Sequence, residues 1–278
     1  MQAALRTNLL LAGVLALLAW FAWPQREDAP APPPERLTAL DPATIGTIRI
    51  ERGQPAEPLQ LQRAQQRWWL LRAGQRLPAD PLRVAQVLRL AEQPSEVSYP
   101  LSAAPLAELG LAPPRVRVTF DRQSLLLGVQ EPLHYRRYVV AGERLHLVAD
   151  TAHVHLVADW SAFVDPAPLA AAASLQAITT PAWRLLRGED GGWQREPPGA
   201  PDAQLLGRRW LELQAEQVEP LAAAGEVAGE PVRLQFADGG ERTLRLVREA
   251  GAARLEWPQA GVAYRLAAGA PQALGWGD

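Results

Sequence analysis

The body of the chain repeats one order of sequence patterns, and this repetition constrains the fold more than any other feature. Residues 61–101 and 183–221 each run from a tryptophan-centred strand pattern through a proline-rich turn to a helix pattern that follows an aspartate. The match continues where "PRVRVTF" from Pro114 resembles "PVRLQF" from Pro231. An offset of roughly 120 residues is too long for a solenoid unit and indicates a duplicated domain. The alternative is a chance likeness between two stretches rich in arginine and leucine.

Each copy carries one predicted helix with a recognisable start. Asp80 stands directly before Pro81, and an aspartate N-cap followed by proline at the first helical position is a strong start signal. Asp202 can cap the second helix. The residues expected to face the core are Val84, Val87, Leu88 and Ala91 in the first helix and Leu206, Trp210 and Leu213 in the second.

Strand patterns surround both helices. In "RVRVTF" the apolar residues Val116, Val118 and Phe120 alternate with polar ones, which is the period of a strand with one buried face. The segments "GEDGGW" and "DGGERT" are typical of hairpin turns. We therefore expect an α+β fold: two tandem, related copies of a mainly antiparallel β-sheet unit with a packed helix, at residues 43–170 and 171–278.

An apolar run near the amino terminus predicts a transmembrane helix. Residues 9–23 contain no charged or polar side chain, and with two preceding residues they suffice for a hydrocarbon core of about 30 Å. The run closes on tryptophan and phenylalanine, where signal peptidase requires small residues, so a retained anchor is favoured over a cleaved signal peptide or a buried soluble helix. The anchor residues are Leu9, Leu10, Leu11, Val14, Leu17, Leu18, Trp20, Phe21 and Trp23.

The flanks of this run predict the topology. Residues 1–8 would form a short cytoplasmic tail, and residues 24–42 a proline-rich linker. The arginine count on the two sides is close to a tie, but a short tail before a single apolar segment resembles an export signal. We therefore expect a single-pass protein of the inner (cytoplasmic) membrane with its body in the periplasm.

Composition narrows the classes further. The net charge of −2 gives no electrostatic footprint for nucleic acid. The absence of cysteine excludes disulfides and lipoprotein processing. All 28 basic residues are arginine, which selection for anion binding could produce but a GC-rich genome explains more simply.

One stretch, "HLVADTAHVHLVADW", contains the candidates for metal chemistry. His155 and Asp159 would share a face in a helix running from Thr151 onward, with His153 near them and His146 approaching from the preceding strand. The stretch lacks a recognised zinc signature, and no glutamate stands beside a histidine. We therefore expect no metal, no cofactor and no catalytic residue, and regard these four side chains as weak metal candidates only.

Other enzyme and ligand signatures are equally weak. The sequence contains no nucleophile elbow, phosphate loop or dinucleotide fingerprint, and its scattered acidic residues nominate no glycosidase pair. The tryptophans beyond the apolar run could form a glycan platform. Trp68, Trp193 and Trp210 recur at matching places in the two copies, which favours core packing instead.

The order of motifs resembles the domain-of-unknown-function family numbered 4340. The segments that carry the resemblance are "IGTIRIERG", "LPADPLRVAQVLRLAEQ", "LAELGLAPPRVRVTF" and "RYVVAGERLHLVA", across about residues 45–215. Leu109, Gly110, Leu111 and Pro113 match a signature that usually begins with an aromatic residue. The resemblance implies one amino-terminal membrane segment and a gene context beside ABC transporter components of the gliding-motility type, and it implies no catalytic residue.

Together these features predict a membrane-anchored periplasmic accessory or binding protein, associated with an ABC-type export system and without catalysis. The expected partners are membrane proteins, including ABC transporter subunits, and the lipid bilayer through the amino-terminal helix. No nucleic acid is expected. The alternatives are a cell-wall glycan-binding module and a metal-dependent enzyme.

We predict that the apolar run is retained in the mature protein, because its bulky carboxyl-terminal end is a poor substrate for signal peptidase. The intact mass of membrane-extracted protein should include residues 1–23. A mature chain that starts near Gln25 would contradict this prediction.

Overall fold

The computed structural model describes the chain from Glu35 onward, which forms one compact unit. The described ranges are 35–53, 57–169, 175–221, 229–249 and 252–276. The predicted anchor, residues 9–23, lies outside them. Within these ranges, no helix combines the length and the apolar character needed to cross a membrane.

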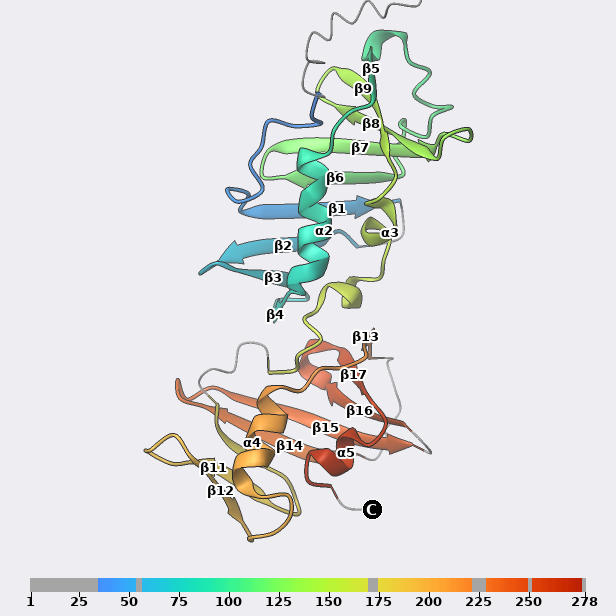
Figure 1. Cartoon of the computed structure of the whole chain (residues 1–278). Helices are drawn as coiled ribbons and strands as arrows, with labels where there is room; N and C mark the ends of the chain where they lie inside the picture. Colours follow the sequence, from blue (N-terminus) through green and yellow to red (C-terminus); the bar gives the residue numbers. More distant parts are fainter. Residues whose placement is uncertain (1–34, 54–56, 170–174, 222–228, 250–251, 277–278) are drawn as a thin grey trace, which may run out of the picture. The chain divides into compact units, whose positions relative to one another are not determined.

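Two antiparallel sheets make up most of the described chain (Figure 1). The first has the strand order β4-β3-β2-β1-β6-β7-β8-β9-β5 and the second β12-β11-β10-β14-β15-β16-β17-β13. The strands of the first sheet are β1 (Thr47–Arg52), β2 (Leu59–Ala64), β3 (Arg67–Arg72), β4 (Gln75–Pro78), β5 (Val97–Pro100), β6 (Val116–Phe120), β7 (Gln123–Gln130), β8 (Arg136–Ala141) and β9 (Arg144–Ala149). Those of the second are β10 (Leu175–Thr179), β11 (Arg184–Arg187), β12 (Trp193–Glu196), β13 (Gln217–Pro220), β14 (Glu230–Phe236), β15 (Glu241–Glu249), β16 (Ala252–Trp257) and β17 (Val262–Leu266).

The helices occupy matching places in the two sheet units. Helices α2 (Pro81–Glu92) and α4 (Ala203–Leu211) each leave the strand at one sheet edge and lead to the strand at the other, and Figure 1 shows each lying across its sheet. Short helices α3 (His153–Leu156) and α5 (Ala270–Ala273) follow the last hairpins. The 3-10 turns are η1 (Leu101–Ala103), η2 (Trp160–Phe163) and η3 (Pro258–Ala260). The shared element order, with β4 as an addition to the first unit, supports the predicted duplication, and strands predominate over helices.

The predicted helix starts are confirmed. The Asp80 carboxylate accepts the N–H groups of Leu82 and Arg83 at 2.8 and 3.3 Å. Asp202 accepts those of the second and third residues of α4 at 3.0 and 3.1 Å. Each such cap stabilises a helix by about 1 kcal/mol because it satisfies N–H groups that have no partner within the helix.

The buried helix faces agree with the predicted ones, with small differences. Helix α2 buries Leu90 where Leu88 was expected, and Leu88 is half-buried against the same core. In α4 the predicted Leu206 and Trp210 are buried. Leu213 is also buried, although the helix has ended before it.

Tryptophan rings build the core of the second unit. The Trp210 ring lies 6.4 Å from that of Trp183 and 5.6 Å from that of Trp276, centroid to centroid. Trp193 packs against α4 so closely that a Cβ added at Gly207 would lie 2.4 Å from its ring. Glycine is thus required where the helix crosses this strand.

The amino-terminal end of the body also packs into the first unit. Leu37 is buried, and its N–H donates to the Gln93 carbonyl at 3.0 Å. The Thr38 hydroxyl donates to the Ala91 carbonyl at 2.8 Å. Residues 35–42, expected within the linker, therefore belong to the folded body, because Leu37 completes the apolar surface near the end of α2.

All four edge strands of the two sheets are short. β4, β5, β12 and β13 each contain four residues. Three of them end on a proline, and β12 is followed by one, these residues being Pro78, Pro100, Pro197 and Pro220.

We predict that Gly207→Ala destabilises the protein. In an open helix this change is favourable by about 1 kcal/mol. Here the contact with Trp193 is too short, and overpacking of this kind costs about 1–3 kcal/mol, so the net effect on the free energy of unfolding should be a loss. Urea unfolding measures it, and the loss should shrink in a Trp193→Leu background. An increase in stability on Gly207→Ala would contradict the packing described.

Candidate functional site: the hairpin tip at residues 131–135

The histidine candidates lie in separate settings. His146, on β9, is only 2% exposed, and its Nδ1 lies 3.0 Å from the Ser95 hydroxyl. Burial lowers the pKa of His146, Glu35 opposes this shift, and Arg144 adds to it. The ring is therefore held as a neutral core group.

The two histidines of α3 are also kept neutral by their surroundings. His155 Nδ1 lies 2.8 Å from Arg83 Nη1, and since a guanidinium can only donate, this nitrogen is the acceptor. Burial and then Arg83 lower the pKa of His155. For His153, burial and then Arg137 lower the pKa against the opposing effect of Asp150, and Arg115 lowers it slightly further.

Asp159 does not share a helix face with His155, and that expectation was wrong. Helix α3 ends at Leu156, and Asp159 instead caps η2 by accepting the Ser161 N–H at 2.9 Å. Because Asp159 begins a new helical turn, it is not part of α3 and does not lie one turn after His155 on the same helix. Within the described ranges, no group of three or more histidine, cysteine or acidic side chains could hold a metal ion.

A cavity of about 190 Å³ lies beside Asp159. Arg72 reaches over the Trp160 ring at 4.3 Å and pairs with Glu57 at 2.6 Å. Burial lowers the pKa of Arg52, and Asp159 opposes this shift. Two arginines and two carboxylates thus line the cavity, so its charge favours neither an anion nor a cation.

The hairpin between β7 and β8 presents a different kind of feature. Its tip, residues 131–135, holds Leu133 and Tyr135 with 80% and 71% of their surfaces exposed. These are among the most exposed large apolar side chains of the described chain, and they stand one residue apart. Single exposed apolar residues are common, whereas a pair held by an ordered turn calls for an explanation.

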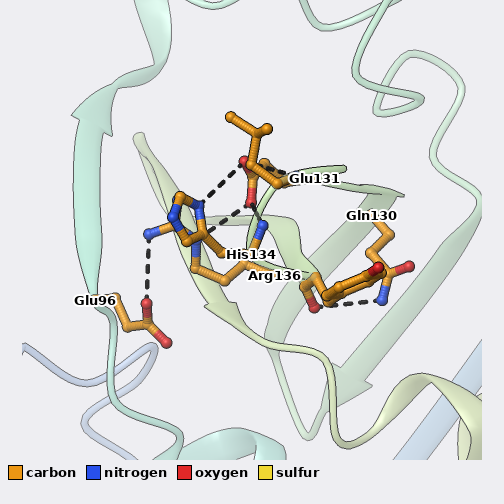
Figure 2. A network of polar contacts seen from close by, with 7 residues as sticks. Glu96, Gln130, Glu131, His134 and Arg136 are labelled. Carbon is orange, nitrogen blue, oxygen red and sulfur yellow. Dashed lines mark hydrogen bonds and ion pairs between the residues drawn. The ribbon is translucent and has the colours of Figure 1, made fainter.

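Glu131 orders this tip from inside (Figure 2). The residue is only 7% exposed, and its carboxylate accepts the N–H groups of Leu133 and His134 at 3.3 and 2.9 Å. The same carboxylate lies 3.5 Å from both the Arg136 Nε and the His134 ring. Burial alone would raise the pKa of Glu131, but the two N–H groups and then Arg136 and the His134 ring outweigh it, so the pKa lies below its usual value.

Further contacts hold the strands next to the tip. Arg136 reaches Glu96 at 3.4 Å, which connects the tip to the segment before β5 (Figure 2). The Gln130 amide donates to the Tyr135 carbonyl at 3.3 Å and to Asp150 at 3.0 Å. The turn is thus supported from both of its strands.

A buried ion pair supports the base of the hairpin. Arg137, 6% exposed, donates two bonds of 2.7 Å to the Asp150 carboxylate and one of 2.5 Å to the Gly128 carbonyl. The β7–β8 register shifts by one residue between Leu127 and Gln130, as in a β-bulge. A Cβ at Gly128 would lie 2.1 Å from the Leu109 carbonyl, so only glycine fits where the preceding loop meets the bulge.

The backbone at Tyr135 is strained. Its φ is +57°, a left-handed conformation that glycine or asparagine adopts more readily than an aromatic residue. The Tyr135 side chain is also largely exposed, so it adds little packing that would stabilise the hairpin. We take this strain as a reason to assign the tip a role outside the hairpin.

Sequence patterns do not predict this site. "QEPLHYRR" contains no glycine or asparagine to indicate a tight turn, and two apolar residues in a loop are unremarkable. The one sequence feature that indicates an ordered turn is Glu131, which stands directly before Pro132. A carboxylate at this position can accept the N–H groups of Leu133 and His134.

We predict that Glu131→Gln loosens the tip. The carboxylate has a lowered pKa in the folded state, so its stabilising effect is present above about pH 4.3, the unfolded value, and is lost as the pH falls through the folded value. Hydrogen exchange at the Leu133 and His134 amides should speed up in the variant at pH 7. Glu143→Gln, in the next hairpin, is the matched control. Unchanged exchange at both amides would show that the carboxylate does not order the turn.

Comparison with known proteins gives no relative. No protein-family model matches the chain, and neither a curated protein nor a solved structure matches it.

Proposed function

We propose that this chain is a membrane-anchored, exported accessory or binding protein that acts by surface contact and not by catalysis. The single observation that carries the proposal is the tip: a turn ordered by a buried carboxylate that keeps Leu133 and Tyr135 in solvent. An arrangement of this kind suits recognition, because the contact surface is formed before binding and little ordering cost remains.

The linker length favours contact close to the bilayer. Residues 24–34, eleven in all, reach only about 34 Å at about 3.1 Å per residue in polyproline form. Tethering at this range raises the effective concentration of the body toward other membrane components. Small contact surfaces can then be sufficient.

An ABC-type export system is the proposed setting. This part of the proposal comes from the resemblance to the family numbered 4340, whose members are often encoded beside such transporters. We assign the partners to the membrane proteins of that system and place the body in the periplasm.

The glycan-binding alternative has less support. Sugar platforms use open aromatic faces, and in the described ranges each tryptophan is buried or half-buried. Trp69, a half-buried ring, is already stacked by Arg76 at 4.4 Å. A metal-dependent enzyme is the least supported alternative, because no group of histidine or acidic side chains in the described part of the chain could hold a metal ion.

We predict that the body requires its anchor. A deletion strain should be rescued by the full chain but not by residues 35–278 exported behind a cleavable signal peptide at the same abundance. The control is the same body fused to an unrelated single-pass anchor with the native linker, which should rescue. Full rescue by the released body, or peptidoglycan binding lost on changing one tryptophan, would contradict the proposal.

A further inference from the structure

We infer that the hairpin tip inserts Leu133 and Tyr135 into the interfacial layer of a lipid bilayer. The inference rests on the proposed function, since it requires that the chain is anchored, and it names the component that the tip contacts: a lipid surface. The tip would then be a second attachment point, separate from the apolar run.

The tip lies close to the residue at which the linker joins the body. Glu35, where the linker joins the body, accepts the Ser95 N–H at its carbonyl at 2.6 Å and the Ser98 hydroxyl at its carboxylate at 2.7 Å. Glu96, directly after Ser95, reaches Arg136 at the base of the tip at 3.4 Å. Glu35, the first described residue, and the tip are therefore neighbours across one short segment, so the tip lies on the side of the body where the linker is attached.

The side chains of the tip suit a lipid interface. The exposed residues of the tip are Pro132, Leu133, His134 and Tyr135, and none is acidic. The one carboxylate of the tip, Glu131, is buried and paired, so it does not repel anionic headgroups. Leucine gains from leaving water, and tyrosine places its ring among the headgroups while its hydroxyl stays hydrated.

The size and shape of the tip favour a lipid surface over a protein partner. A stable protein–protein contact buries roughly 800 Å² on each partner, drawn from about 20–30 residues a side. The tip is a projecting turn with four exposed residues, too small to supply such a surface by itself. A fluid interface needs no complementary pocket, and tethering lets a weak insertion persist.

Insertion of the tip has a mechanical consequence. A body held only by an extended linker can rotate freely, whereas a body held at the linker and at the tip presents one fixed side to the membrane. The remaining surfaces, including the second sheet unit, would then be offered to partners in a defined orientation.

The test uses the full chain in liposomes of phosphatidylcholine and phosphatidylglycerol that contain nitroxide-labelled lipids. Because the protein has no cysteine, Leu133→Cys gives a single site for an environment-sensitive fluorophore. Leu133 is 80% exposed, so the fold does not depend on it. The matched control is Arg122→Cys, at the other end of β7 and about 26 Å along the strand.

The expected result is a blue-shifted emission and lipid quenching at position 133, with neither at position 122. With the label moved to Tyr135→Cys, adding Leu133→Asp should abolish both signals while the chain still floats with the liposomes. A chain that floats but shows no quenching at 133 or 135 overturns this inference alone. A chain that does not float contradicts the anchor and the proposed function. Shielding of the label only when native membrane proteins are added would assign the tip to a protein partner and overturn the lipid contact.

Discussion

Each sheet packs a large apolar face against one long helix, and in the first sheet a smaller cluster around Leu111, Val140 and Leu145 covers part of the opposite face. The strand period of two places apolar side chains on one side of the sheet, as in β6, where Val116, Val118 and Phe120 are buried. The helix that covers this face has to begin at a defined residue and cross from one edge to the other. The aspartate caps satisfy the first need, and the connection between opposite edge strands satisfies the second. Both sheet units share this arrangement of a capped helix between opposite edge strands, and this likeness supports the predicted duplication.

The hairpin tip depends on a different interaction, the buried pair between Arg137 and Asp150. Ion pairs of this kind add little net stability, because removing both charges from water costs nearly as much as their attraction returns. Such a pair instead fixes geometry. The planar Arg137 guanidinium can donate to the Asp150 carboxylate and to the Gly128 carbonyl at the same time in only one arrangement. The bulge is thereby fixed, and the tip is aimed in one direction. Glu131 then orders the turn itself, so the strained backbone at Tyr135 is held by the surrounding bonds.

The sequence predicted the framework well because the framework depends on local signals. An aspartate before a helix pattern, alternation along a strand and a glycine-rich turn each act within a few residues, and Asp80, Val116 and the turn before Trp193 were read correctly. The misreadings concern contacts distant in the chain. Leu37 was assigned to a linker because only the folded helix α2 supplies the surface that buries it. His155 and Asp159 were placed on one helix because the role of Asp159 as the cap of the next helical turn was not recognised. The tip was missed altogether, since Arg137, Asp150 and Gly128 meet only after three strands have paired.

The short edge strands restrict how these sheets can meet other chains. An open edge presents a row of unpaired N–H and C=O groups and invites another strand to add to it. Here each edge is four residues long, and proline at its end, as at Pro78 and Pro220, removes a donor from the row. Two sheets in tandem on one chain would otherwise be prone to join edge to edge, within a molecule or between neighbouring molecules. The edges of both sheets are therefore poor templates for strand addition, and contact with another chain would be left to side chains, which can change without altering the fold.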